Sequence, residues 1–125
     1  MADSGWIAII DDDPSVLMAL TRALRIQGLR SKSYASAREF LSETTDPPNC
    51  LIVDLQMPGM TGLELLRHLK QIGRPIPTII VTAHGGDTVR QDCEAAGAVA
   101  FLTKPWRNST LLAAIDDATG TRPKV

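Results

Sequence analysis

The residues of this sequence that could carry out chemistry together are polar side chains standing where short apolar runs end. They are Asp11, Asp12, Asp54, Thr82 and Lys104. Open parallel sheets bind ligands at the carboxyl ends of their strands, in the crevice where the strand order reverses. If the apolar runs are neighbouring parallel strands, these side chains converge into one pocket, although they are spread over most of the chain.

The three aspartates of this set predict a metal site. Carboxylates held about 4 Å apart would repel one another by roughly 4 kcal/mol per pair at an effective dielectric constant near 20, so the cluster requires a bound cation or a proton. Its ligands are all oxygen, with no adjacent His or Cys, which favours a hard ion such as Mg2+ or Mn2+. With the metal bound, Asp54 could attack a phosphoryl group as a carboxylate nucleophile, while Lys104 and Thr82 stabilise the transferring oxygens.

The elements that must position these side chains alternate between strand-like and helix-like patterns. Apolar runs, and one short polar run typical of an edge strand, predict strands over residues 6–10, 29–34, 50–53, 78–81 and 98–102. Helix starts are predicted at Asp13-Pro14, Ser36 with Glu39, Thr61 with Glu64, and Gly85-Gly86-Asp87. Helix ends are predicted at Gly28, Gly73 and Gly97, and Leu111, Leu112 and Ile115 form the stripe of a last helix.

Five strands alternating with five helices predict a single-domain α/β fold, in which a doubly wound five-stranded parallel sheet carries helices on both faces. A chain of 125 residues leaves no room for a second domain of ordinary size. We place the domain at residues 1–118. Residues 119–125 have linker composition, and we interpret them as a tail or the start of a linker to an output domain not present in this chain.

Composition and charge exclude several classes of function. A net charge of −1 without a basic cluster argues against direct nucleic-acid binding. The longest apolar runs are far shorter than the roughly 20 residues that span a bilayer, so we expect no membrane association. The N-terminus lacks the segments of a secretion signal, which predicts a cytoplasmic protein. Cys50 and Cys93 lack metal-ligand spacing and are expected to be buried as small hydrophobic residues.

The sequence resembles the receiver domains of bacterial two-component response regulators over residues 6–118. The matching motifs are Ile10-Asp11-Asp12-Asp13-Pro14, the run from Val53 to Gly62, Val81-Thr82-Ala83, and Lys104-Pro105. Their order and spacing together are far more specific than any one of them. The resemblance implies the flavodoxin-like strand order 2-1-3-4-5 and a signalling switch that catalyses its own phosphorylation and dephosphorylation, rather than an enzyme acting on external substrates.

The resemblance also implies roles for individual residues. Asp54 would be phosphorylated, and Asp11, Asp12 and the Gln56 backbone carbonyl would bind magnesium together with it. Thr82 and Lys104 would contact the phosphoryl group. The implied switch residues are Thr82 and the aromatic Phe101. The resemblance also implies that Gln56, Ala83 and His84 tune phosphate loss, and that the peptide bond between Lys104 and Pro105 is cis.

The implied partners are a sensor histidine kinase or phosphotransfer protein as phosphodonor, and an attached or separate output that is expected to control transcription. Self-association would use the fourth helix, the fifth strand and the fifth helix. Residues 34–41 are most similar to receivers of nitrogen-fixation-type regulators with a LuxR-type helix-turn-helix output. Arg107 departs from an acidic residue common in relatives, so we expect Asn108 or Ser109 to cap the last helix.

Three alternatives are weighed against this interpretation. Haloacid-dehalogenase-type phosphatases also form an aspartyl phosphate, but they carry a second aspartate where this chain has Gln56. A flavodoxin-like flavin carrier would place phosphate beside the acidic residues 11–13, which would repel it. A degenerate receiver would lack the phosphoacceptor or the lysine. Taken singly, Asp13 could be only a helix cap and Thr82 a strand-end hydroxyl, and His68 and His84 are expected at the surface.

Overall fold

The computed structural model of the protein describes residues 5–43 and 46–120. The strands are β1 (Ile7–Ile10), β2 (Ser31–Tyr34), β3 (Cys50–Asp54), β4 (Thr78–Thr82) and β5 (Ala100–Thr103). The helices are α1 (Pro14–Ile26), α2 (Ala37–Ser42), α3 (Gly62–Gln71), α4 (Asp87–Ala95) and α5 (Asn108–Thr119). Each strand overlaps a predicted run, and the ends differ by one or two residues.

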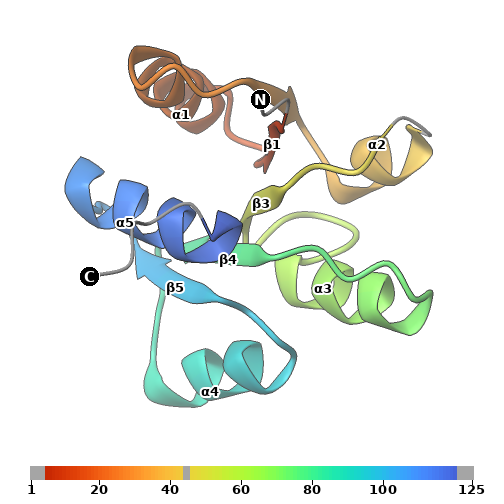
Figure 1. Ribbon diagram of the computed structural model, residues 1–125. Helices are drawn as coiled ribbons and strands as arrows, with labels where there is room; N and C mark the ends of the chain where they lie inside the picture. The colour runs from red at the N-terminus through yellow and green to blue at the C-terminus, as the bar shows by residue number, and fades with distance from the viewer. Residues whose placement is uncertain (1–4, 44–45, 121–125) are drawn as a thin grey trace.

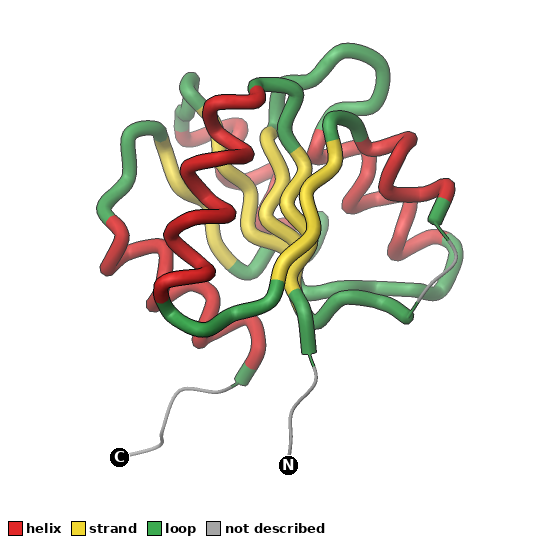
Figure 2. The backbone as a smooth tube through the Cα atoms, turned by 90° about the horizontal axis from the view of Figure 1, so that it is seen from above, coloured by secondary structure: helices red, strands yellow, loops and turns green. Residues whose placement is uncertain are grey.

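The five strands form one parallel sheet in the order β2-β1-β3-β4-β5, which confirms the predicted fold and strand order. Helices α1 and α5 lie on one face of the sheet, and α2, α3 and α4 lie on the other (Figure 1). Seen from above, the strands run between two layers of helices (Figure 2). The three central strands β1, β3 and β4 are buried along their whole length, because helices cover both of their faces.

Two apolar clusters hold the helices to the sheet. Under α1 and α5, buried side chains of these helices pack on Ile9, Ile52 and Ile79. Under α2, α3 and α4, the second cluster packs on Ile10, Val53 and Ile80. The side-chain alternation of each strand therefore supplies both faces. Within the described part of the chain, no helix is both long and apolar enough to cross a membrane.

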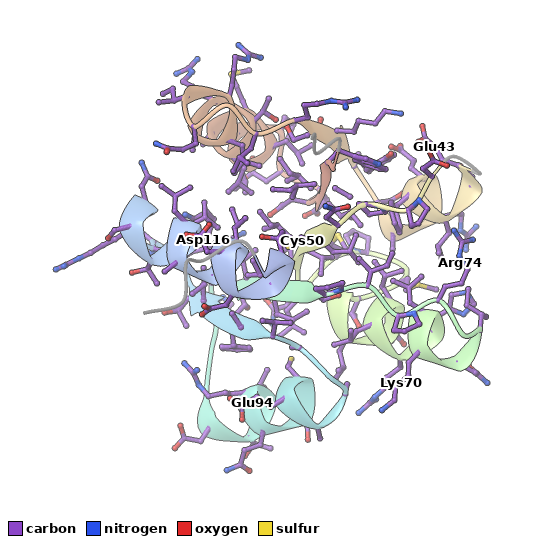
Figure 3. The ribbon with its side chains drawn as sticks, in the orientation of Figure 1. Glu43, Cys50, Lys70, Arg74, Glu94 and Asp116 are labelled. Carbon is purple, nitrogen blue, oxygen red and sulfur yellow. The ribbon has the colours of Figure 1, made fainter. Side chains whose placement is uncertain are left out.

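Both cysteines are buried thiols within these clusters, as predicted. Cys50 lies in the interior between the helices and the sheet (Figure 3). Burial raises the pKa of its thiol to about 12. Burial also raises the pKa of Cys93, on the inner face of α4. Both side chains therefore stay neutral and serve as small packing groups.

The ends of three helices follow the predicted local chemistry. In α3 the Thr61 hydroxyl accepts a hydrogen bond from the Glu64 amide, and the Glu64 carboxylate accepts one from the Thr61 amide, which completes a capping box. Helix α1 ends in a Schellman motif, with Leu29 N–H donating to the Leu24 carbonyl and Gly28 in the left-handed region. Equivalent bonds follow Gly73 and Gly97.

The start of α5 differs from our expectation. Neither Asn108 nor Ser109 is the N-cap; Arg107 occupies that position, and its side chain makes no capping hydrogen bond. The extended backbone at Arg107 (φ −87°, ψ 145°) sets the helix boundary, so Asn108 already has helical geometry whatever its side chain prefers. At the other end, Thr119, which we assigned to the tail, is the last residue of α5. Residues 121–125 of that predicted tail lie outside the described residues.

The two kinds of helix start predict opposite responses to substitution. Thr61→Ala should lower the free energy of unfolding by about 1 kcal/mol, because it leaves the Glu64 amide without its cap. Arg107→Asp should raise it by about 1 kcal/mol, because it supplies both a cap and a negative charge at the helix start. Urea unfolding followed by circular dichroism measures both. Thr88→Ala, on the exposed side of α4, is the control and should change the free energy of unfolding by less than about 0.5 kcal/mol. Equal effects of all three variants would contradict the assignment of Thr61 as a cap and of Arg107 as an uncapped helix start.

Candidate functional site

The five side chains singled out in the sequence lie along one edge of the sheet. Asp11 and Asp12 directly follow β1, and Asp54 and Thr82 end β3 and β4. Lys104 directly follows β5. Because all strands are parallel and β1, β3, β4 and β5 are neighbours, these positions share the carboxyl edge. The Lys104 side chain lies within contact distance of both Asp11 and Asp54.

Asp11, Asp12 and Asp54 form an acidic cluster in which one carboxylate oxygen from each lies within 4.8 Å of the others. Asp11 and Asp54 are buried, with exposed fractions of 1% and 6%, whereas Asp12 is exposed. The Asp13 amide donates a hydrogen bond of 2.9 Å to Asp11 Oδ1, which orients that carboxylate. A set of carboxylate oxygens that opens to solvent at Asp12 fits a hard divalent cation, which keeps part of its water shell.

Lys104 reaches across the sheet edge to both buried carboxylates. Its Nζ lies 3.3 Å from Asp11 Oδ2 and 3.6 Å from Asp54 Oδ1. The peptide bond between Lys104 and Pro105 is cis. One ammonium opposite three carboxylates leaves the cluster with an excess of negative charge, so Lys104 reduces the repulsion without removing it.

The environment of Asp54 opposes its ionisation. Burial raises the pKa of its carboxyl above the ordinary value, and the neighbouring charge of Asp11 raises it further. Lys104 and a hydrogen bond from the Gln56 backbone lower the pKa in part. The ionised form of Asp54 is thus incompletely compensated by the protein, and a cation placed among the three carboxylates would stabilise it.

Thr82 ties the site to the loop between β4 and α4. Its hydroxyl is fully buried, accepts a hydrogen bond of 3.1 Å from the His84 amide and donates one of 3.3 Å to the His84 carbonyl. To donate to a phosphoryl oxygen the hydroxyl would have to release that carbonyl. Ala83 and His84 are exposed at this point, and Gln56 is exposed in the loop after β3. These three side chains therefore stand at the open mouth of the site.

Phe101 lies deeper, on the face of the sheet that α2, α3 and α4 cover. Phe101 is 6% exposed, and its backbone is in register with Ile80 of β4. The Arg90 guanidinium stacks 4.9 Å from the ring centroid, and a Cβ added at Gly85 would stand 3.2 Å from the ring. No sequence motif links Arg90 to Phe101, because only the packing of α4 on β5 brings the two side chains together.

The two histidines behave differently from each other. His84 is exposed, as expected. His68, which we also expected at the surface, is partly buried, because the end of α3 turns one side toward α2. It lines a cavity of about 140 Å3 together with residues from both chain halves: Trp6, Tyr34, Phe40, Ile72 and Arg74. None of the acidic-cluster residues lines this cavity.

Comparison with known proteins identifies the class. Residues 7–116 match the response regulator receiver domain family. The chain is 41% identical over 119 residues to the response regulator protein TmoT of Ectopseudomonas mendocina, covering 94% of this chain and 54% of that protein. It is 37% identical over 113 residues to the transcriptional regulatory protein FixJ of Rhizobium meliloti, covering 90% of this chain and 55% of that protein. The chain thus spans about half the length of these relatives.

Solved structures agree with this assignment. The crystal structure of FixJ-N superposes with a TM-score of 0.87 at 34% identity, covering 99% of this chain and 100% of that one. The response regulator StyR superposes with a TM-score of 0.86 at 36% identity, over 95% of this chain and 61% of that chain. The protein therefore belongs to the receiver-domain family of two-component response regulators, and it is a signalling domain.

The acidic cluster makes a prediction for stability. Asp54→Asn should raise the free energy of unfolding of the metal-free protein by on the order of 1 kcal/mol, because it removes a buried charge beside Asp11. Saturating Mg2+ should stabilise the wild type and should stabilise the variant much less. Urea unfolding in EDTA and in Mg2+ measures both effects.

The control for this prediction is Asp92→Asn, which removes a charge from the exposed surface of α4. It should leave the Mg2+ effect unchanged. The prediction is contradicted if Asp54→Asn destabilises the metal-free protein or gains as much from Mg2+ as the wild type does.

Proposed function

We propose that Asp54 is the phosphoacceptor of this receiver domain and that its phosphorylation changes the conformation of the β4–α4 loop and α4. The observation that supports the proposal is the contact of Lys104 with both Asp11 and Asp54 inside the three-carboxylate cluster. These groups meet where the sheet opens, so a phosphoryl group could approach Asp54 from solvent beside Asp12. Carboxylate nucleophile, cation ligands and an ammonium are what phosphoryl transfer requires.

The proposed donor is the phosphohistidine of a sensor histidine kinase or of a phosphotransfer protein. A carboxylate oxygen of Asp54 attacks phosphorus as the bond from phosphorus to the donor imidazole breaks. The electron pair of that bond passes to the ring nitrogen, and the imidazole leaves neutral after it takes up a proton. Lys104 stabilises the charge on the transferring oxygens, and Thr82 would donate its hydroxyl to one of them.

Asp11, Asp12, Asp54 and the Gln56 backbone carbonyl would hold Mg2+, or Mn2+ in its place. The bound cation would neutralise the cluster and the phosphoryl oxygens. Dephosphorylation is a separate step, in which water attacks phosphorus and the bond from phosphorus to the Asp54 oxygen breaks, which releases inorganic phosphate and restores the Asp54 carboxylate. Gln56, Ala83 and His84 stand exposed at the mouth of the site, and we propose that they set how readily water enters.

The output of the switch lies outside this chain. Relatives named for transcription include the transcriptional regulatory protein FixJ and the DNA-binding transcriptional regulator NtrC of Klebsiella pneumoniae, of which this chain covers 55% and 24%. We propose that this receiver controls transcription in the cytoplasm through an attached or partner output, and that this chain itself does not bind nucleic acid. Self-association through α4, β5 and α5 and the boundary of the domain at residue 118 remain predictions.

Intact-protein mass spectrometry tests the proposal. Incubation with acetyl phosphate and Mg2+ should add the mass of one HPO3 group, and Asp54→Asn should abolish the addition. Asp13→Asn is the matched control, because Asp13 caps α1 through the Ser15 amide and should leave the adduct in place. An adduct of the same mass that survives Asp54→Asn would overturn the assignment.

Lys104 gives a second, kinetic prediction. Lys104→Met should slow phosphorylation by acetyl phosphate about 100-fold, because the ammonium that stabilises the transferring oxygens is lost. The variant should also gain more stability from Mg2+ than the wild type, since the cation then faces the carboxylates alone. Stopped-flow tryptophan fluorescence and unfolding in Mg2+ measure these effects. A rate within twofold of the wild type would exclude Lys104 from the transfer step.

A further inference from the structure

Helix α4 is attached to the sheet by few side chains. Among residues 87–95 only Cys93 is fully buried, and Val89 is partly buried against the same cluster. The N-cap residue of the helix is Gly86, which directly follows Gly85 and provides no side-chain hydrogen bond. Apolar contact and capping, which fix the position of most helices, are therefore both weak for α4.

The contact that supplements this attachment is the stack of Arg90 on Phe101. The guanidinium carbon lies 4.9 Å from the ring centroid, within the range of a cation–π interaction. Arg90 is exposed while the ring beneath it is buried, so the arginine covers the ring and shields it from solvent. In Figure 1, α4 lies beside β5, the strand that carries Phe101.

The other boundary of the ring is the loop that begins at Thr82. A Cβ placed at Gly85 would come within 3.2 Å of Phe101 Cε1 and 2.6 Å of Thr103 Cγ2. Only glycine allows the backbone to pass this close. The same loop is fastened at its start by the hydrogen bonds between Thr82 and His84. The ring of Phe101 therefore lies between the loop that begins at Thr82 and the Arg90 side chain of α4.

We propose that Arg90 is a positioning residue that fastens α4 to the ring of Phe101, so that the ring leaves its buried place only together with a displacement of the helix. Without the stack the two movements become independent. The link from Thr82 to the helix rests on the proposed function, whereas the coupling of ring and helix rests on the observed contact alone.

The experiment follows ring and helix separately in the full chain. Labelling with 4-fluorophenylalanine gives two 19F signals, because the chain holds two phenylalanines, and Phe101→Leu assigns them. The effect of a paramagnetic cosolvent on the 19F signal of Phe101 reports how far the ring is exposed to solvent. Amide signals of Val89 and Cys93 report the helix. Both are recorded in buffer and during titration with beryllofluoride and Mg2+, a stable mimic of the phosphoryl group.

Arg90→Met, which keeps an unbranched side chain but removes the charge, should raise the exposed population of the ring roughly two- to fivefold. At saturating beryllofluoride the ring exposure and the amide signals should both change in the wild type, whereas in Arg90→Met one should change without a matching change in the other. Arg90→Lys retains the cation and should keep most of the coupling. Gln91→Met places the same side chain on a neighbouring exposed position of α4 and should behave as the wild type does.

Two results would overturn the proposal: an unchanged ring exposure in Arg90→Met, or ring and amide signals that still both change at saturation to the wild-type extent in that variant. Failure of the proposed function has a different signature. The wild type would then show no response to beryllofluoride, while the effect of Arg90→Met on ring exposure in buffer alone would still confirm or refute the stack.

Discussion

Two buried carboxylates held beside a third are the constraint on which the rest of this structure depends. Asp11 and Asp54 are both buried, and burial together with the neighbouring charge of Asp11 raises the pKa of the Asp54 carboxyl above its ordinary value. Lys104 offsets only part of this cost. The fold must therefore hold the aspartates at the ends of rigid elements, and it does so on β1 and β3, which are buried along their whole length. A cation among these carboxylates then lowers the free energy of an arrangement that the core already enforces.

The same edge of the sheet determines how a change at Asp54 can spread. Thr82 is the last residue of β4, the strand next to β3. Its hydroxyl is hydrogen-bonded to the His84 backbone in the loop that leads to α4. That loop passes over Phe101 at a distance that only Gly85 permits. Because few apolar side chains hold α4 to the sheet, a small displacement of the loop can move the helix at little energetic cost. In our proposal, the stack of Arg90 on Phe101 makes the helix α4 and the ring move together.

Much of this arrangement could be predicted from the sequence because its signals are local. Four apolar runs and one short polar run located the strands to within one or two residues, and the polar residues at or just past the ends of the four apolar runs located the site. The strand order came from the resemblance, since no local pattern specifies which strands pair. The cap of α5 was predicted wrongly because side-chain preference was weighed without the backbone of Arg107. Arg90 was missed because its partner stands on a different element, and its charge alone is typical of an exposed helix face.

Under the proposed function, Gln56 would make this site better suited to a switch than to a hydrolase. A phosphatase that passes through an aspartyl phosphate needs a base to activate the water that attacks it, and an amide cannot accept a proton at neutral pH. Asp11 and Asp12 belong to the acidic cluster, where their carboxylate oxygens would serve as ligands of the cation. Water entering past Gln56 would therefore meet no side chain at that position able to deprotonate it. The phosphorylated form would then persist long enough for α4 and its partners to respond, which is the property that signalling requires.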